Sequence, residues 1–301
     1  MPDNSLNYQN ITPVSEERLT VINELLINAN IAIPMSMAYI RKVQGWDFNQ
    51  LEKRFHGISK STFQCYLQPS YQKIRPLHII AAYSWLTMMP MACLYYGLRI
   101  KEAYPNMDDT STECLIHSGL LPTNQFKLVI SHLHDYLSVE DQEKANIGIN
   151  AITKKYGSLE DYDDSDYFFP QKLDIKKFGT DYYRSLAIGC KKVRQENNIS
   201  ANTMAKIVGL SPYRYQRLED PENLTLLPVE LGAKLQMGLG LDNAMLFTAN
   251  MKTYSQFHTV RKLQLIRQSL LIELMKHLDN KNKKFFSSMV LNLSSMYLNT
   301  P

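Results

Sequence analysis

Residues 193–221, VRQENNISANTMAKIVGLSPYRYQRLEDP, carry the clearest local structural pattern in the chain. Ser200 is a preferred N-cap residue and predicts a short helix after it. Gly209 predicts the end of that helix, because glycine adopts a left-handed turn without a Cβ penalty. Ser211 then caps a second helix whose first position is Pro212, a residue that suits the first helical turn. The stretch therefore predicts two short helices joined by a tight turn.

Apolar side chains in this stretch recur at helical spacing and predict one buried face for the helix pair. The side chains expected in the core are Met204, Ala205, Ile207, Tyr215 and Leu218. The first helix is expected over 201–208, and the small side chain of Ala205 lets the two helices cross closely. The second helix would expose Tyr213, Arg214, Gln216 and Arg217. A basic, donor-rich face of this kind suits the major groove of DNA.

This stretch resembles the helix-turn-helix of the phage-repressor/Cro (XRE-type) family. The pattern of that family is an apolar-Arg pair, a Ser cap, Leu-Ala, Gly-apolar-Ser and a closing apolar-Glu. In this chain the pattern falls on Val193-Arg194, Ser200, Met204-Ala205, Gly209-Leu210-Ser211 and Leu218-Glu219. The resemblance covers residues 184–241, with a trailing core helix expected over 226–239.

The resemblance implies which residues contact DNA. The family's base-reading positions correspond to Ser211, Pro212, Tyr213, Gln216 and Arg217. Pro212 departs from the usual polar residue and has no side-chain donor. The Gln with which the family contacts a phosphate is Ala201 here, so we expect Asn202 to make that contact. The family also pairs Arg194 with Glu219, and we expect the same ion pair in this chain.

Residues 40–67, IRKVQGWDFNQLEKRFHGISKSTFQCYL, repeat the pattern more loosely. The corresponding positions are Ile40-Arg41, the caps Asp47 and Ser59, Leu51, Gly57-Ile58-Ser59, Phe63 and Tyr66. Helices are expected over 48–56 and 60–67, and Pro76 is expected to open a long apolar helix that resembles the family's trailing helix. In this copy Lys60, Ser61, Thr62 and Gln64 would face the groove.

The first copy departs from the family pattern at three positions. One extra residue precedes Gly57, and Glu52 replaces the small Ala. Leu67 replaces the Glu that would pair with Arg41. The copy is therefore expected to share the fold, while its contact with DNA is a weaker expectation than that of the second copy.

The net charge of the 301-residue chain is only +4, but this charge is unevenly distributed. Residues 35–76 have a local balance of +5, residues 182–220 of +4 and residues 251–301 of +6, whereas residues 104–170 have a balance of −8. Basic segments separated by an acidic one are typical of a protein that binds a polyanion. The alternative is solvated surface charge that clusters without a function.

The chain as a whole is predicted to be all-α, with tandem lambda-repressor-like modules and additional connecting and C-terminal helices. The expected domains are an N-terminal helix-turn-helix domain over 1–103, an acidic connector and linker over 104–178, the XRE-type domain over 179–251 and amphipathic helices over 252–301. Pro34 is expected to open a helix over 35–44. Residues 157–169, GSLEDYDDSDYFF, lack the glycine turn and terminal Glu of a calcium loop and are expected to form a solvated linker.

Residues 79–98 contain no charge, and this run has the length of a membrane span. Pro90 stands in the middle of the run and several tyrosines interrupt it, so a buried helix followed by a second short helix is the preferred interpretation. Residues 260–274 are amphipathic and predict either core or a dimer seam. We expect a homodimer, because a second amphipathic helix after them already offers core cover. The alternative is one chain that spans an asymmetric site with its two copies.

Catalysis and metal binding find little support in the sequence. The four cysteines form no C-x-x-C, the seven histidines are dispersed, and no nucleophile has an evident activating base. The N-terminus lacks a secretory signal pattern. The sequence therefore predicts a cytoplasmic transcription regulator without cofactor or membrane anchor, whose partner is double-stranded DNA. The alternatives are a protein-interaction adaptor and an antitoxin-like repressor, in which a protein partner binds and only the second copy contacts DNA.

Overall fold

The computed structural model describes residues 8–98, 104, 106–166 and 172–297, and within them the fold is all-α. These residues form fifteen α-helices, four 3₁₀ turns and two strands of two residues each. The predicted all-α class is therefore confirmed.

Two helical units make up one side of the molecule. The first helical unit contains α2 (Ala29–Val43), α3 (Phe48–Arg54), α4 (Lys60–Tyr66), α5 (Leu77–Leu86), α6 (Met91–Tyr95) and the 3₁₀ turn η1 (Tyr96–Leu98). The second helical unit contains α10 (Ile175–Glu196), α11 (Ala201–Val208), α12 (Pro212–Leu218), α13 (Glu230–Gly238) and the 3₁₀ turn η4 (Met245–Thr248).

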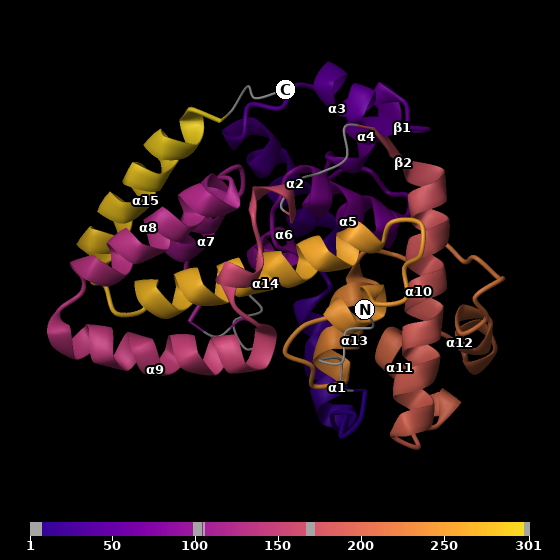
Figure 1. The fold of residues 1–301 in the computed structure, drawn as a ribbon. Coiled ribbons are helices and arrows are strands. Elements are labelled where there is room, and N and C mark those ends of the chain that lie inside the picture. Colours follow the sequence, from indigo (N-terminus) through magenta and orange to yellow (C-terminus); the bar gives the residue numbers. More distant parts are fainter. Residues whose placement is uncertain (1–7, 99–103, 105, 167–171, 298–301) are drawn as a thin grey trace.

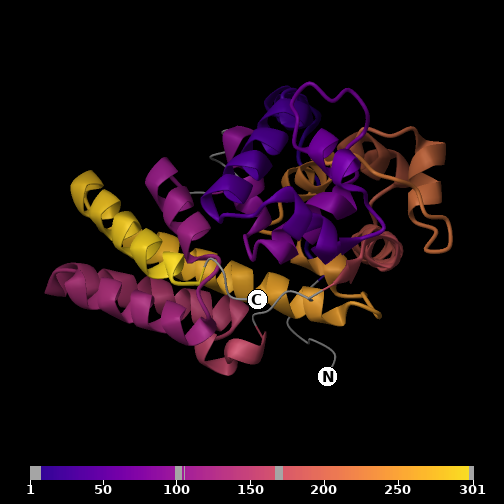
Figure 2. The same ribbon diagram turned by 90° about the horizontal axis from the view of Figure 1, so that it is seen from above.

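The remaining helices form a second group beside these units. They are α7 (Asp109–Ser118), α8 (Thr123–Tyr136), α9 (Val139–Tyr156), α14 (Ser255–Met275) and α15 (Asn280–Ser295), with the 3₁₀ turns η2 (Leu159–Asp161) and η3 (Asp164–Asp166). Figure 2 shows these helices gathered on one side and the two units on the other, with α14 reaching across both. α1 (Glu16–Leu25) packs against α13.

α14 is the central helix of the fold, and it contacts α5, α7, α8, α9 and η4 (Figure 1). The apolar stripe expected to be core or dimer seam is therefore core, since Val260, Leu263, Leu270 and Leu274 are all buried within the chain. Arg267 is buried beside them. Its guanidinium donates hydrogen bonds to the backbone oxygens of Ser118 and Leu121 at 2.8 and 3.0 Å and lies over the Phe126 ring.

Two contacts between backbone segments join the helical units directly. The strand β1 (Phe55–His56) lies between α3 and α4 and pairs in parallel with β2 (Leu173–Asp174), which immediately precedes α10. Farther along the chain, Pro76 and Pro228 form an isolated antiparallel bridge, in which the Leu77 amide donates to the Leu227 carbonyl at 2.8 Å. The units are therefore connected through the loops that flank α4 and α13.

The uncharged run over 79–98 forms a buried helix and a second short helix, as preferred from the sequence. All ten residues of α5 are buried, and a break at 87–90 separates this helix from α6. No single helix in the described residues is long and apolar enough to cross a membrane, although the bent pair of α1 and α2 meets both criteria when the two are taken together.

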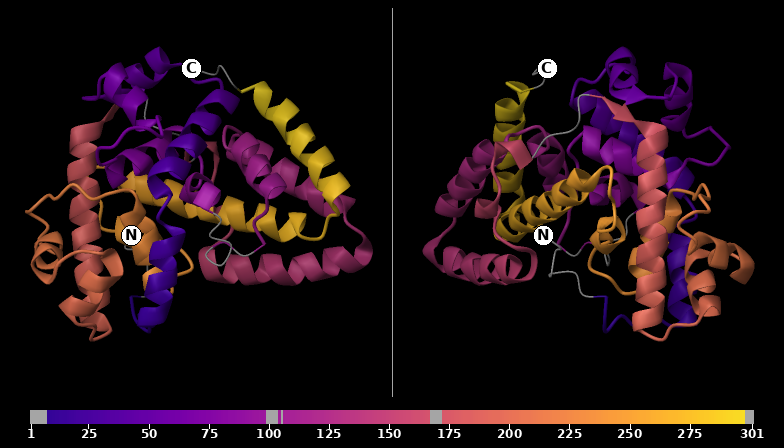
Figure 3. Two further views of the ribbon diagram at one scale, coloured as in Figure 1. Left: turned by 180° about the vertical axis from the view of Figure 1, so that it is seen from behind. Right: turned by 45° about the vertical axis from the view of Figure 1, so that its right-hand side comes forward.

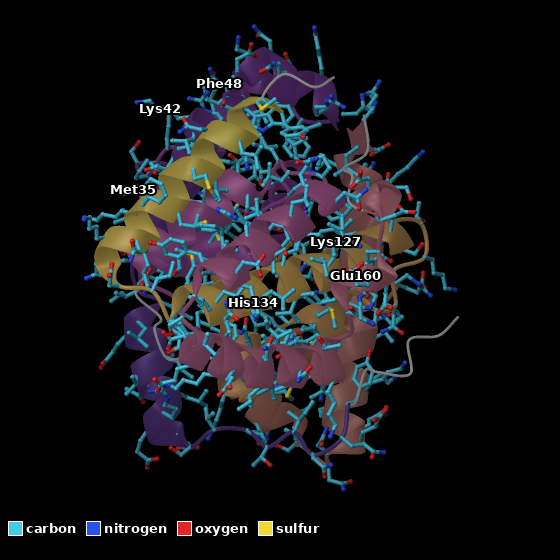
Figure 4. The ribbon with its side chains drawn as sticks, turned by 60° about the vertical axis from the view of Figure 1, so that its left-hand side comes forward. Met35, Lys42, Phe48, Lys127, His134 and Glu160 are labelled. Atoms are coloured by element: carbon cyan, nitrogen blue, oxygen red, sulfur yellow. The ribbon has the colours of Figure 1, made fainter. Side chains whose placement is uncertain are left out.

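One expectation from the sequence is wrong, and another holds only in part. Pro34 does not open a helix, because α2 begins at Ala29 and contains Pro34 as a buried residue. The segment 157–169 is not simply a solvated linker up to residue 166, where the described part ends. Leu159 is buried, η2 and η3 contact α14, and Lys127 pairs with Glu160 at 3.0 Å (Figure 4). The buried Leu159 and the Lys127–Glu160 ion pair hold the acidic segment against the core, and Asp164 accepts hydrogen bonds from the Asn124 amide and side chain at 2.9 and 3.1 Å.

The segment before α1 belongs spatially to the second helical unit. The Val14 amide donates to the Gly238 carbonyl at 3.0 Å, and the Ile11 amide donates to Asn197 Oδ1 at 2.8 Å. Lys206 on α11 pairs with the exposed Glu16. Residues 8–26 therefore cover the α10–α11 corner and α13, although they precede the first unit in sequence.

Packing of α5 against α10 buries a titratable ring. His78 Nδ1 lies 3.0 Å from the Tyr183 hydroxyl, and burial lowers the pKa of His78 to about 4. The unfolded chain protonates this ring near pH 6.5, whereas the native chain does so only near pH 4. The stability that His78 confers is therefore complete above about pH 6.5 and is lost as the pH falls toward 4.

Between pH 7 and pH 5 the free energy of unfolding should fall by about 2 kcal/mol more in the native chain than in His78→Gln. The reason is that protonation of His78 in the unfolded state lowers the free energy of unfolding by about 1.4 kcal/mol for each pH unit below about 6.5. Urea denaturation at the two pH values measures this difference, and the variant serves as the control because every other titrating group is unchanged. Equal losses in both proteins would contradict the prediction.

Candidate nucleic-acid interface

The α11–α12 pair has the bounds and caps that the sequence predicted for 201–208 and for the helix from Pro212. Ser200 Oγ accepts from the Thr203 amide at 3.0 Å, and Ser211 Oγ accepts from the Arg214 amide at 3.3 Å. Gly209 has a φ of 70°, the left-handed conformation that glycine adopts without strain. The trailing helix α13 begins at Glu230, which is later than the expected 226.

Every side chain expected in the core of this pair is buried: Met204, Ala205, Ile207, Tyr215 and Leu218. α11 contacts both α12 and α13. α13 therefore packs against α11 on the side away from α12, while α12 buries Tyr215 and Leu218 and leaves its other residues exposed to solvent.

The predicted ion pair between Arg194 on α10 and Glu219 at the end of α12 is present. Arg194 Nε and Nη2 donate to the two carboxylate oxygens of Glu219 at 2.7 and 2.8 Å, a bidentate geometry. The buried Tyr215 hydroxyl also donates to Glu219 Oε1 at 2.7 Å. The hydrogen bond to Glu219 raises the pKa of Arg194, and burial raises the pKa of Tyr215, so the network keeps its protons at neutral pH.

The outer face of α12 presents the side chains expected there. Ser211, Pro212, Tyr213, Arg214, Gln216, Arg217 and, on α11, Asn202 are all exposed. Arg217 Nη2 donates to Asn223 Oδ1 at 3.2 Å, and its guanidinium lies 6.0 Å from the centre of the Tyr213 ring. Two arginines, one glutamine and one tyrosine therefore lie together on the exposed side of α12.

The first helical unit has the expected caps. Asp47 and Gln50 form a reciprocal capping box at the start of α3, and Ser59 Oγ accepts from the Thr62 amide at 3.2 Å at the start of α4. Gly57 has a φ of 89°. The residues Leu51 and Phe63 are buried as predicted, and so is Leu67. The helix expected over 48–56 ends at Arg54, because the extra residue before Gly57 allows β1 to form.

Arginines take the place of the missing ion pair in this unit. Arg41 donates to the Trp46 carbonyl at 2.6 Å and lies over the Phe48 ring. The buried Arg75 donates to the carbonyls of Tyr66 and Gln68 at the end of α4. α4 is therefore held at its carboxyl end by a guanidinium instead of by a carboxylate.

The face of α4 is less open than that of α12. Ser61 is exposed, but Lys60, Thr62 and Gln64 are only partly exposed. Lys60 Nζ donates to Asn49 Oδ1 at 2.7 Å, and its amide donates to Glu52. The carboxylate at position 52, which departs from the family pattern, therefore caps α4 in place of packing beneath it.

Three contacts that support the interface were not identified from the sequence. They are made by the Tyr215 hydroxyl, by Asn223 and by Arg75. The four-residue spacing of Tyr215 and Glu219 could have indicated their contact, because residues at i and i+4 are neighbours on a helix. Asn223 and Arg75 lie in loops, and no local periodicity predicts which helix end a loop side chain reaches.

Other chemistry has little support in the described residues. Burial raises the pKa of the Cys93, Cys114 and Cys190 thiols above the usual range, which makes them poor nucleophiles. Within the described part of the chain, no three His, Cys, Asp or Glu side chains are grouped so that they could hold a metal ion.

No protein-family model, no curated protein and no solved structure matches this chain.

Proposed function

We propose that this chain is a sequence-specific DNA-binding transcription regulator. In this proposal α11–α12 is a helix-turn-helix module of the XRE type, and α12 enters the major groove. The observation that carries the proposal is the exposed face of Tyr213, Arg214, Gln216 and Arg217 on a helix whose far end is fixed by the Arg194–Glu219 pair. A fixed recognition helix loses little conformational entropy when it binds.

Each exposed side chain has a role in this proposal. Arginine donates bidentately to guanine and glutamine pairs with adenine, so Arg217 and Gln216 are the base readers. Tyr213 and Arg214 lie beside them, and Ser211 and Pro212 form the leading edge of the helix. Asn202 on α11 contacts the phosphate backbone, which sets the register but carries no sequence information.

The first helical unit takes part as a second module. Its recognition helix is α4, with Lys60, Ser61, Thr62 and Gln64 toward the DNA. A cytoplasmic location belongs to the same proposal, and it agrees with four cysteines that form no disulfide. A homodimer remains a prediction, and the stripe over 260–274 that was expected to form it is buried within the chain.

We expect Arg217→Ala to weaken binding to the preferred site by about 1–3 kcal/mol and to weaken binding to random-sequence DNA far less. Fluorescence anisotropy with both duplexes at one salt concentration measures the two losses. Lys191→Ala, an exposed cation on α10, is the matched control and should affect both duplexes alike. An equal loss on both duplexes for Arg217→Ala would move this residue into the class of phosphate contacts.

One observation favours the protein-interaction adaptor as a second candidate. The exposed face of the α1–α2 corner and α2 carries Ile27, Ile31, Met35 and Tyr39 at four-residue spacing, and Figure 4 shows Met35 at the edge of the molecule. Such a stripe suits a partner helix. In that case only α12 contacts DNA, and Gln64→Ala on α4 leaves DNA affinity and sequence preference unchanged.

A further inference from the structure

The antiparallel bridge between the units joins residues at equivalent positions of the repeat. Pro76 and Pro228 are 152 positions apart in sequence, as are the turn glycines Gly57 and Gly209 and the caps Ser59 and Ser211. The bridge pairs Pro76 with Pro228 themselves. An antiparallel pairing of equivalent residues is what a two-fold axis through the bridge produces, and α5 and α13, which follow the two prolines, also contact each other.

The packing around the bridge extends this local symmetry. In the first unit α2 contacts α6 and η1, and in the second unit α10 contacts η4. Tyr95 at the end of α6 and Phe247 in η4 are again 152 positions apart, and both are buried. The repeat therefore includes the helix or turn after each trailing helix. A two-fold rotation does not change the position of an element along the axis. Both recognition helices therefore lie at the same end of the two-unit assembly, measured along that axis.

α10 carries one anchor for each of the two recognition helices. At its amino end β2 pairs with β1, which ends at His56, a few residues before α4 begins. Near its carboxyl end Arg194 holds Glu219 at the end of α12. Figures 1 and 3 agree that α3 and α4 lie near the amino end of α10 and that α12 lies beside its carboxyl half.

The spacing of these two anchors matches DNA. Asp174, which pairs with His56, and Arg194 are separated by about 20 residues of continuous helix, or about 30 Å at a rise of 1.5 Å per residue. Successive major grooves on one face of B-DNA are about 34 Å apart. α10 is largely buried along one side and uninterrupted, so it holds the two anchors at a fixed separation.

We infer that a single copy of this chain contacts two successive major grooves of double-stranded DNA, with α12 in one groove and α4 in the next. This inference rests on the proposed function. The two recognition faces differ, because Lys60, Ser61 and Thr62 stand where the second unit has Pro212, Tyr213 and Arg214. The operator is therefore a pair of unlike half-sites centred about one helical turn apart, and one chain occupies it.

Selection from a random-sequence duplex library with the full chain tests the arrangement. The expected product is a bipartite motif with two unlike halves about 10 base pairs apart, bound at one chain per duplex in native mass spectrometry. Two chains on an inverted repeat of identical halves would overturn the inference in favour of a homodimer. A single undivided motif would overturn it and leave the proposed function intact, whereas no enrichment at all would remove the proposed function.

Two glutamines provide a matched pair of variants. Gln64 on α4 and Gln216 on α12 are equivalent positions of the repeat. We expect each change to alanine to reduce base discrimination about tenfold in one half of the motif and to leave the other half unchanged. If Gln216→Ala relaxes both halves and Gln64→Ala relaxes neither, α12 alone reads DNA and the inference is wrong.

The fixed spacing is tested by insertions between the halves. Because α10 does not lengthen, inserting either five or ten base pairs should lower affinity at least about tenfold, the loss expected when one module disengages. Full affinity after the ten-pair insertion would show that the modules move independently and would overturn the role of α10.

Discussion

Raising the salt concentration from about 50 to about 200 mM should lower the affinity of this chain for DNA about a thousandfold, if its two modules together neutralise about six phosphates. The physical reason is the release of condensed counterions, which makes log K fall by about 0.9 per phosphate contact for each log unit of salt. The basic balances of 35–76 and 182–220 supply the charge for these contacts. A titration of anisotropy against salt at constant pH measures the slope.

The same titration on a Lys191→Ala, Lys192→Ala variant provides the internal comparison. Both side chains are exposed on α10, and loss of a phosphate contact reduces the slope by about 0.9 for each lysine that makes one. Affinity that stays flat between the two salt concentrations would exclude phosphate contacts and remove the proposed function.

Glu219→Ala should lower the free energy of unfolding by about 2–4 kcal/mol. The buried carboxylate of Glu219 accepts both hydrogen bonds from Arg194 and one from the Tyr215 hydroxyl. Its removal leaves a buried hydroxyl and a largely buried guanidinium without their acceptor, and breaking such a pair costs about 3–5 kcal/mol when it is fully buried. The expected value is lower because 24% of the Arg194 side chain is exposed to solvent.

Urea denaturation of the full chain measures this loss, and Glu140→Ala is its matched control. Glu140 pairs with Lys144 one helical turn away on α9, and both side chains are more than half exposed. An exposed pair of this kind contributes little to stability, because water screens the attraction between its charges. Equal destabilisation by the two variants would show that the Arg194–Glu219 pair does not fix α12, and the main support for the recognition helix would be lost.

Both short helix pairs could be predicted from the sequence. Ser200, Ser211, Asp47 and Ser59 each bond an amide two or three residues away, and Gly209 ends its helix through its own backbone angle. Interactions of this range depend only on neighbouring residues, so a single sequence contains all the information they need. The Arg194–Glu219 pair was predicted from the family resemblance, and the structure contains it.

Contacts between distant segments could not be predicted in the same way. The periodicity of 260–274 shows that one face of α14 is apolar, but the same pattern arises whether a second chain or the chain's own α5, α7, α8 and α9 cover that face. Pro34 similarly lies inside α2, because the burial of α2 in the core offsets the cost of a proline within a helix.

The relation between the two helical units is also a property of tertiary structure. β1 pairs with β2 across more than a hundred residues of sequence, and Pro76 reaches Pro228 across an even longer separation. Caps, turns and the buried face of each helix follow from residues within one or two turns of each other. The spacing of α4 and α12 along α10 follows instead from backbone pairing and burial between remote segments, whose free energy depends on the packing of the whole core.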